Sequence, residues 1–356
     1  MLLRGAKILN ENFLFEYADI EIEGGKISKI LPTCEADNPN LTIIPGLIDT
    51  HIHGCMGVDT MDGEFEKMSV YLAKNGVTSF LPTTMTTPIS DIIRVLKADT
   101  RVIGAQILGF HLEGPYVNAK YKGAQNEEYI KTPDMADFND FSGKIKMITI
   151  APEIENGLTF IAEASKKYVV SLGHTDTDYD TAITAVENGA GCVTHLYNAM
   201  KGLNHREPNL IGAAFMKNIY AQIICDGIHI HKAAINIAYR LFSEDRLILI
   251  SDSLRACGLA DGVYDLGGQR VTVKDKIARI DNGSIAGSTS NLWECVKKAV
   301  EFEIPFESAI KMATKNPADL IGAKSKGIIK EGYDADLVII DENLNIIQTI
   351  IAGEIF

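Results

Sequence analysis

Short runs of β-branched and other apolar residues recur through the middle of the chain, and longer segments with helical spacing separate them. Eight runs predict strands, at residues 41–49, 77–84, 105–113, 144–152, 168–175, 191–195, 220–227 and 246–253. Helical spacing of apolar residues follows most of them, at 64–75, 88–98, 155–167, 178–188 and 231–243. Continuously apolar strands are typical of a parallel sheet that is buried on both faces. Eight such βα units predict an α/β protein with a (β/α)8 TIM-like barrel.

The two ends of the chain have a different pattern. Residues 1–43 alternate apolar and polar side chains around a Gly24-Gly25 turn, and the last residues repeat that strand-rich pattern. Alternation with tight glycine turns is typical of antiparallel strands. We therefore expect a small β-sandwich domain from residues 1–44 and 326–356, and a barrel from 45–325. A β-hairpin excursion is expected near 263–288, followed by helices at 290–302 and 306–315.

Composition narrows the class of protein. The 356 residues carry a net charge of −13, which argues against nucleic acid as a partner because neutralising phosphates requires a basic face. Six scattered cysteines, without a C-x-x-C pair, indicate thiols in a reducing compartment. The chain has no signal-peptide pattern and no run near the roughly 18 apolar residues of a membrane span. These features predict a cytoplasmic protein.

Reactive side chains gather where the predicted strands end. Seven of the eight histidines lie at or just beyond the carboxyl end of a strand, where a barrel of this kind places its catalytic groups. The residues at strand ends are His51, His53, His111, Glu113, His174, His195, Asp226, His229 and Asp252. Chance placement would scatter them over helices and loops, so one rim of the barrel is the predicted active site.

This set of residue types indicates a metal site. Residues i and i+2 of a strand face the same side, so His51 and His53 can both point into the barrel mouth. Borderline divalent metals prefer imidazole and carboxylate ligands, and Glu113, His174 and His195 offer three more. A hydrolytic metal site keeps one position open for a water molecule, whose pKa falls to roughly 7.

Asp252 is the natural proton carrier of such a site, because a carboxylate near a cation stays ionised and can accept the water's proton. Each residue alone can have a purely structural role: an H-x-H pair can close an ordinary strand, Glu113 can form a salt bridge, and Asp252 can cap a helix. Their joint placement at one end of one barrel favours a metal-dependent hydrolase. Structural roles fit Asp49, Asp59, Cys55 and His231 better.

The loop after the sixth strand, HLYNAMKGLNHREPNLIG, offers a possible anion pocket. Amide donors of Asn198 and Ala199, together with Arg206, suit phosphate oxygens, which the planar guanidinium matches well. A solvated loop with an incidental arginine explains the same residues, and the pattern alone does not separate the two interpretations.

With these residues in view, the chain resembles the N-acetylglucosamine-6-phosphate deacetylase family, a branch of the amidohydrolase superfamily. The motifs that carry the resemblance run almost from end to end: PGLIDTHIHG, FHLEGPY, LGHTDT, THLYNAM, REPNLIGA, CDGIHI, SDSLRACGLADG, GSIAGS and NPADLIG…KGIIKEGYDADLVIID. HLEGP and THLYNAM are specific to this branch. The resemblance implies hydrolysis of the acetamido group of N-acetylglucosamine 6-phosphate, which releases glucosamine 6-phosphate and acetate.

The resemblance also implies roles for individual residues. Glu113, His174 and His195 would hold the principal divalent metal, zinc or iron, and Asp252 would act as general base and then general acid. Asn198, Ala199, Arg206 and His229 would contact the sugar phosphate. Arg206 would reach the active site of a neighbouring subunit, which implies a homodimer.

Two features bear on the family pattern. Some members lack the first-strand histidines and carry one metal, whereas His51 and His53 are present here and favour a second ion. Many members place a histidine shortly after HLEGP to polarise the substrate carbonyl, but KGAQNE places Gln125 there. An uncharged amide is a weaker electrophile, so the second metal is a candidate for the polarising role.

Three alternatives remain at this point. A deacetylase for N-acetylgalactosamine 6-phosphate differs only by one epimeric hydroxyl of its substrate. Another amidohydrolase, acting on cyclic amides or deaminating its substrate, would often use a carboxylated lysine, and no lysine ends a predicted strand at the matching place. A barrel that binds sugar phosphate without turnover would have no use for Asp252.

Overall fold

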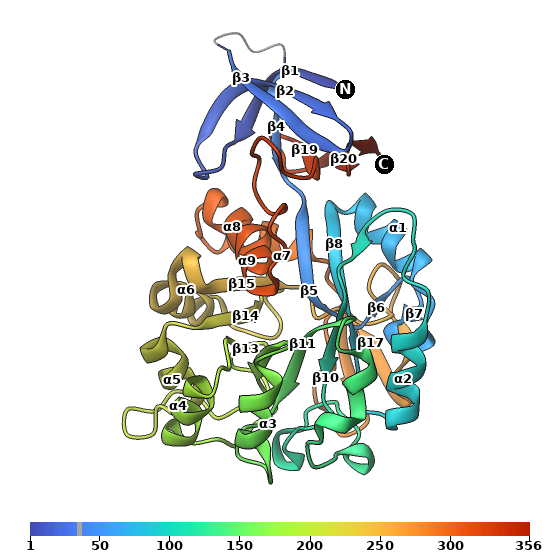
Figure 1. Ribbon diagram of the computed structural model, residues 1–356, viewed down its shortest axis with the longest axis vertical. Coiled ribbons are helices and arrows are strands. Elements are labelled where there is room, and N and C mark those ends of the chain that lie inside the picture. Colours follow the sequence, from blue (N-terminus) through green and yellow to red (C-terminus); the bar gives the residue numbers. More distant parts are fainter. Residues whose placement is uncertain (34–37) are drawn as a thin grey trace.

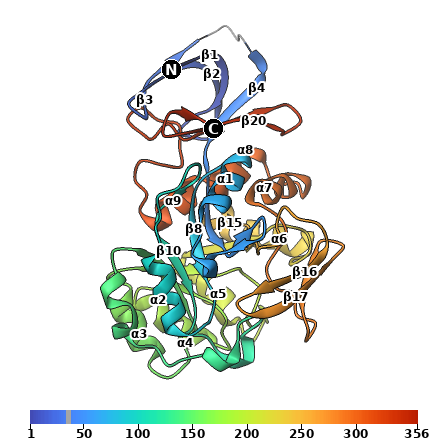
Figure 2. The ribbon, with the colours of Figure 1, turned by 90° about the vertical axis from the view of Figure 1, so that its right-hand side faces the viewer.

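The computed structural model describes residues 1–33 and 38–356, and its largest sheet is the barrel seen in Figures 1 and 2. Its strands follow the order β15-β14-β13-β12-β11-β10-β8-β5, and all neighbouring pairs are parallel. They are β5 (Leu47–Ile52), β8 (Val77–Thr84), β10 (Phe110–Glu113), β11 (Ile145–Ile150), β12 (Val169–Leu172), β13 (Cys192–Val193), β14 (Tyr220–Ile224) and β15 (Leu247–Ile250), with the short β9 (Gln106–Ile107) beside β8. The predicted (β/α)8 fold class is confirmed.

Backbone hydrogen bonds join the first barrel strand to the segment that follows the last one. The Asp252 N–H donates to the His51 carbonyl (2.9 Å), and the His53 N–H donates to the Ser253 carbonyl (2.9 Å). These bonds bring residues some 200 positions apart into register at the carboxyl ends of the strands.

Helices surround the barrel (Figure 1). They are α1 (Glu66–Lys74), α2 (Ile89–Lys97), α3 (Gly157–Ala164), α4 (Tyr179–Glu187), α5 (Asn209–Lys217), α6 (Lys232–Arg246), α7 (Leu292–Glu301), α8 (Phe306–Ala313) and α9 (Lys315–Ile321). Short 3-10 turns replace a helix between β10 and β11. None of the described helices is long and apolar enough to cross a membrane.

Three local predictions were wrong in detail. The run 41–49 is two strands, because the chain leaves β4 (Asn38–Pro45) at Gly46 and enters β5. Helix α5 was not expected, since its NLIGAAFM core lacks polar spacing. The helix expected at 306–315 breaks at Thr314, and a separate α9 begins there; Pro317 is tolerated in its first turn, where no intrahelical N–H bond is needed.

Strands from both ends of the chain form a second sheet above the barrel (Figures 1 and 2). Its order is β21-β20-β19-β4-β1-β2-β3, comprising β1 (Leu2–Leu9), β2 (Phe15–Glu23), β3 (Lys26–Pro32), β4, β19 (Leu337–Asp341), β20 (Ile346–Ile351) and β21 (Glu354–Ile355). Its core combines Ile8, Ile20 and Ile43 with Leu337 and Ile350, so neither end of the chain can bury this face alone.

A third, antiparallel sheet interrupts the chain between β15 and α7. Its strands β16 (Gly262–Leu266), β17 (Gln269–Lys274) and β18 (Ile277–Ile280) lie on one side of the barrel (Figure 2). The excursion therefore has one strand more than a hairpin. Gln269 ties it to the barrel by donating from its amide nitrogen to the Ala124 carbonyl.

Candidate metal centre

A cavity of about 350 Å³ lies at the carboxyl ends of the barrel strands. Its polar wall contains most of the residues that the sequence pointed to: His53, Glu113, Gln125, His174, His195, Asn198, Ala199, His229 and Asp252. The predicted gathering of strand-end residues at one rim is therefore observed.

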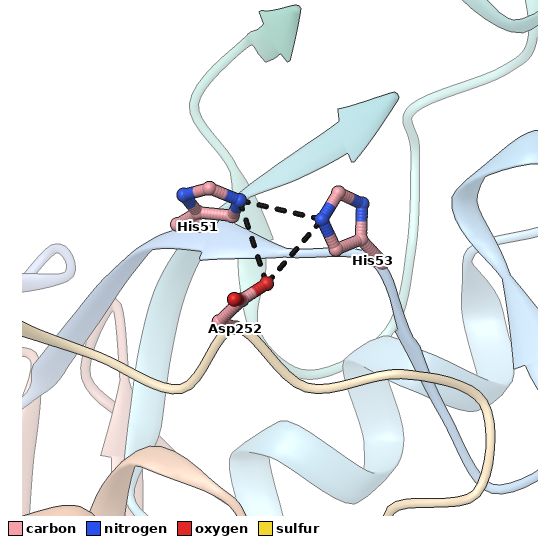
Figure 3. Close-up of side chains that lie close together, drawn as sticks. All are labelled: His51, His53 and Asp252. Atoms are coloured by element: carbon pink, nitrogen blue, oxygen red, sulfur yellow. Dashed lines mark hydrogen bonds and ion pairs between the residues drawn. The ribbon is translucent and has the colours of Figure 1, made fainter. Parts of the chain in front are cut away.

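His51, His53 and Asp252 form one compact triad (Figure 3). The two histidines occupy β5 and the loop that follows it, two positions apart, and their Nε2 atoms are 3.3 Å from each other. The Asp252 Oδ1 atom is 3.5 Å from the His51 Nε2 atom and 3.3 Å from the His53 Nε2 atom. All three side chains are at least 90% buried. Three ligand atoms thus converge on one point, as a cation site requires.

Glu113, His174 and His195 form a second buried triad. The Glu113 Oε1 atom is 3.1 Å from the His174 Nε2 atom and 3.0 Å from the His195 Nε2 atom, and the two Nε2 atoms are 3.1 Å apart. The residues end β10, follow β12 and follow β13, so three separate βα units supply one ligand each.

Glu113 connects the two triads. Its Oε1 atom also lies 3.4 Å from the His51 Nε2 atom, and its Oε2 atom lies 3.2 Å from the His53 Nε2 atom. A carboxylate can offer one oxygen to each of two ions. The geometry therefore accommodates two adjacent cations with Glu113 between them.

Outer hydrogen bonds set the protonation pattern of the histidines. The Nδ1 atom of His53 lies 3.1 Å from the Thr83 carbonyl, and that of His174 lies 3.0 Å from the Tyr121 carbonyl. A carbonyl only accepts, so in both rings Nδ1–H donates and Nε2 is the nitrogen left to bind a cation. Metal-ligating histidines almost always make this kind of second contact. The donor set therefore fits a divalent metal.

The pKa values of the buried carboxyl and imidazole groups also fit a cation site. Burial raises the pKa of the Asp252 carboxyl, but the charges of His51 and His53 outweigh burial and hold that pKa at about 2. The pKa of Glu113 is likewise held well below its usual range, by His51 and His174 against the effect of burial. Burial lowers the pKa of His53, yet its bonds with both carboxylates raise it well above normal. Imidazole protons thus balance the buried carboxylates, and a cation would replace them.

The backbone is strained where these residues sit. His174, His195 and Asp252 have φ values of 49°, 30° and 47°, and Ala199 has 49°. Non-glycine residues in this left-handed region cost about 1–3 kcal/mol each and cluster at functional sites. Strand ends that turn sharply here aim their side chains back over the barrel mouth.

The residues expected to bind substrate fall into two groups. Asn198, Ala199 and His229 line the cavity beside the triads. His229 is held by Asp226, whose Oδ2 atom is 2.7 Å from the His229 Nδ1 atom. Arg206 is exposed and does not line the cavity of its own chain. Of the described residues that line this cavity, none is a lysine or an arginine.

Gln125 is buried, lines the cavity and hydrogen-bonds to Glu113. Its amide nitrogen donates to the Glu113 Oε2 atom at 2.6 Å, and its amide oxygen accepts the Thr86 N–H at 2.7 Å. Both ends of the carboxamide are hydrogen-bonded, so Gln125 orients the Glu113 carboxylate, which lies between the two triads.

Several residues of the site were not singled out from the sequence. Leu266 at the end of β16 and Met85 line the cavity, as do Ile285 and Gly287, for which the motif GSIAGS was the only signal. Gln222 in β14 contacts the His51 Nδ1 atom at 3.2 Å. The only sequence signal for Gln222 was its place as a polar residue inside the apolar run YAQII. The contacts of the β16–β18 sheet with the cavity depend on the tertiary fold.

Comparison with known proteins adds independent evidence. Residues 42–356 match the family described as "Amidohydrolase family". An N-acetylglucosamine-6-phosphate deacetylase of Lysinibacillus sphaericus is 38% identical, covering 100% of this chain and 97% of the relative. An N-acetylgalactosamine-6-phosphate deacetylase of Escherichia coli O157:H7 is 33% identical, covering 99% and 98%. The crystal structure of an N-acetylglucosamine-6-phosphate deacetylase from Thermotoga maritima superposes with a TM-score of 0.94 at 33% identity, covering 100% of this chain and 99% of that one.

Proposed function

Because this chain belongs to the amidohydrolase family, we propose that it is a metal-dependent deacetylase that hydrolyses the N-acetyl group of N-acetylglucosamine 6-phosphate to glucosamine 6-phosphate and acetate. The observation that carries the proposal is the convergence of Glu113, His174 and His195 beside Asp252 in one cavity. The 38% identical deacetylase, aligned over the whole chain, supports the choice of substrate.

The ligand assignment follows from the two triads. Glu113, His174 and His195 would hold the principal ion, and His51 and His53 would hold a second one with a share of Glu113. When bound, a divalent metal lowers the pKa of a coordinated water to roughly 7 and so supplies a hydroxide nucleophile near neutral pH. Zinc and iron both accept imidazole and carboxylate ligands.

Asp252 is assigned the proton transfers. Its low pKa keeps the carboxylate ionised before the reaction, so it can accept a proton from the attacking water. The same group would then deliver that proton to the departing amine of the sugar, since the amide nitrogen leaves only when protonated. Its position on the rim, 7% exposed and lining the cavity, gives it access to both atoms.

The sugar phosphate would be recognised by Asn198, Ala199 and His229 from the same chain. Burial lowers the pKa of His229, but the bond and the charge of Asp226 raise it above normal overall, so this imidazole at the cavity keeps its second proton to higher pH than a free one. We further propose that Arg206 supplies a second cation to the active site of a partner subunit in a homodimer, because it is exposed outside its own cavity.

The compartment follows from the thiols. The five described cysteines, Cys55, Cys192, Cys225, Cys257 and Cys295, are buried and free. Free thiols are typical of a reducing compartment, so the cytoplasm is proposed as the location.

An N-acetylgalactosamine 6-phosphate deacetylase is the second candidate, supported by the 33% identical relative. A kinetic assay of both acetylated sugar phosphates, with a cyclic amide as a third substrate, tests the proposal. We expect the highest kcat/KM with the gluco substrate. A higher value with the galacto substrate would assign the chain to the second candidate, and turnover of the cyclic amide alone would contradict both.

The metal assignment has its own experiment. Elemental analysis of protein purified without added metal identifies the native ion. Replacing His51 and His53 together with asparagine should lower the metal content per chain while the ion at the other triad remains. An unchanged metal content would show that one site alone is occupied.

A further inference from the structure

The histidines of the two triads differ in how their outer nitrogens are held. The Nδ1 atoms of His53 and His174 face backbone carbonyls. A carbonyl always accepts, so the backbone fixes the tautomer that can bind metal through Nε2. His51 instead faces the side-chain amide of Gln222, with 3.2 Å between the His51 Nδ1 and Gln222 Oε1 atoms. An amide presents an acceptor at one end and a donor at the other, so its orientation decides which His51 tautomer is favoured.

The surroundings of Gln222 select one orientation. Its amide nitrogen lies 3.2 Å from the Thr50 Oγ1 atom and 3.7 Å from the Met147 Sδ atom. A hydroxyl can donate or accept and would tolerate either end of the amide, but a thioether carries no hydrogen and can only accept. Met147 therefore decides the orientation: the NH2 group faces the sulfur, and the Oε1 atom faces His51.

The location of Gln222 directs its amide at His51. The side chain is fully buried in β14, in the run YAQII. Burying an amide costs free energy unless it is hydrogen-bonded, and here the partner of the amide oxygen is the His51 ring. The one acceptor that Gln222 brings into the barrel interior therefore faces the outer nitrogen of His51.

We propose that Gln222, oriented by Met147 and hydrogen-bonded to Thr50, is a positioning residue that fixes His51 with its proton on Nδ1, and so controls metal affinity at the site of His51 and His53 independently of the Glu113–His174–His195 triad. The inference rests on the proposed function, in that both triads are taken to bind metal. An acceptor opposite Nδ1 keeps the Nε2 lone pair free for the cation and makes it more basic.

Metal titration of the full chain tests this inference. Protein stripped by a chelator is titrated with Zn²⁺ against a competing chelator, which yields a dissociation constant for each triad. Gln222→Met keeps the length of the side chain but removes the acceptor, and Gln222→Glu keeps an oxygen acceptor. Loss of such an outer contact typically weakens metal binding about 10–100-fold. In Gln222→Met we expect that loss of affinity only at the site of His51 and His53. In Gln222→Glu we expect near wild-type affinity at both sites.

Two further variants separate positioning from packing. Thr50→Val removes the hydroxyl beside the Gln222 amide nitrogen and should weaken the same site by a smaller factor. Ser171→Ala removes another buried hydroxyl of the barrel interior, whose partner at 2.6 Å is the Thr194 Oγ1 atom, and should leave both dissociation constants unchanged. Thermal unfolding of each metal-free variant shows whether the fold is retained.

Equal affinities of wild type and Gln222→Met at both sites would overturn the inference and leave the proposed function standing. An equal loss of metal affinity at both sites would also overturn the inference. A loss in Gln222→Glu as large as that in Gln222→Met would do the same, because either result would indicate general packing damage. Binding of only one ion by the wild type would overturn the inference too, and the deacetylase assay of the wild type would show separately whether the proposed function holds.

Discussion

Each side chain of the two triads depends on a small number of local contacts. Gln125 holds the Glu113 Oε2 atom at 2.6 Å, and the Tyr121 carbonyl accepts from His174 at 3.0 Å. The His195 Nδ1 atom is buried and has no hydrogen-bond partner among the described residues. The ring of His195 is thus held by packing and by its inward contacts, unlike the rings of His53 and His174.

Asp252→Asn tests the proton carrier. Asparagine keeps the shape and one oxygen near His51 and His53 but cannot take a proton, so metal should remain at the Glu113 triad while kcat falls about 10²–10⁴-fold, the usual contribution of general acid–base catalysis. Steady-state kinetics with parallel metal analysis measures both effects. Normal turnover in this variant would refute the role of Asp252.

Asp226→Asn tests how His229 is kept charged. Without the carboxylate, the pKa of His229 should fall, because Asp226 is what raises it against burial. A raised pKa keeps the imidazolium present to higher pH, so wild-type kcat/KM should decrease as pH rises through that pKa, and the variant should show the decrease at lower pH. At neutral pH we expect KM to rise about tenfold, equivalent to about 1.4 kcal/mol, with kcat largely kept. A KM and pH profile equal to the wild type would exclude this role.

At the scale of elements, the carboxyl ends of the strands do most of the positioning. Strand β5 contributes the His51 side chain, and the loops after β12 and β13 turn back through positive φ values to present His174 and His195. The hydrogen bonds between the His51 and His53 backbone and residues 252–253 bring Asp252 opposite the two imidazoles. Closure of the barrel therefore assembles the first triad directly.

Gly46 connects the terminal sheet to the barrel, and its substitution tests how tightly β5 packs on β8. A Cβ atom at Gly46 would lie 2.2 Å from the Thr78 Oγ1 atom and 2.3 Å from its Cγ2 atom. Gly46→Ala should lower the free energy of unfolding by about 1–3 kcal/mol, the usual cost of overpacking. Gly143→Ala is the control, since nothing lies within 4 Å of its added Cβ atom. Chemical denaturation measures both, and equal stability of the two variants would contradict this account.

At the scale of the whole molecule, one chain encloses both triads but presents few cations to the anionic substrate that we propose. The cavity is lined by His229 but by no lysine or arginine among the described residues, and Arg206 is exposed beyond it. A phosphate group would gain a bidentate partner if a second chain brought its arginine to this opening. The proposed homodimer supplies that charge.

Mixed dimers test the shared site. Arg206→Ala and Asp252→Asn chains are each expected to be nearly inactive alone. If Arg206 acts in the partner's site, half of the dimers formed after unfolding and refolding the mixture would carry one intact site, which gives about a quarter of wild-type activity. A double variant mixed with an inactive single variant serves as the control. No recovery in the first mixture, with dimers confirmed by light scattering, would show that Arg206 does not act in the partner's active site.

The pattern of apolar and polar residues predicted much of this molecule. It identified the barrel, its carboxyl-terminal rim and the residues of both triads, because strand periodicity and strand ends are local properties of the chain. It did not separate β4 from β5 at Gly46 and did not predict α5, where packing on the rest of the protein outweighs local spacing.

The sequence by itself thus determined the fold class, the chemical types of the ligands and, through its motifs, the resemblance to a family that residues 42–356 bear out. Only the tertiary structure decided that Glu113 lies between the two triads, that Gln125 and Gln222 each contact a triad side chain, and that Leu266 and Ile285 line the cavity. The reason is physical: strand ends are specified by neighbouring residues, whereas distances of about 3 Å between side chains arise when barrel closure brings distant strands together.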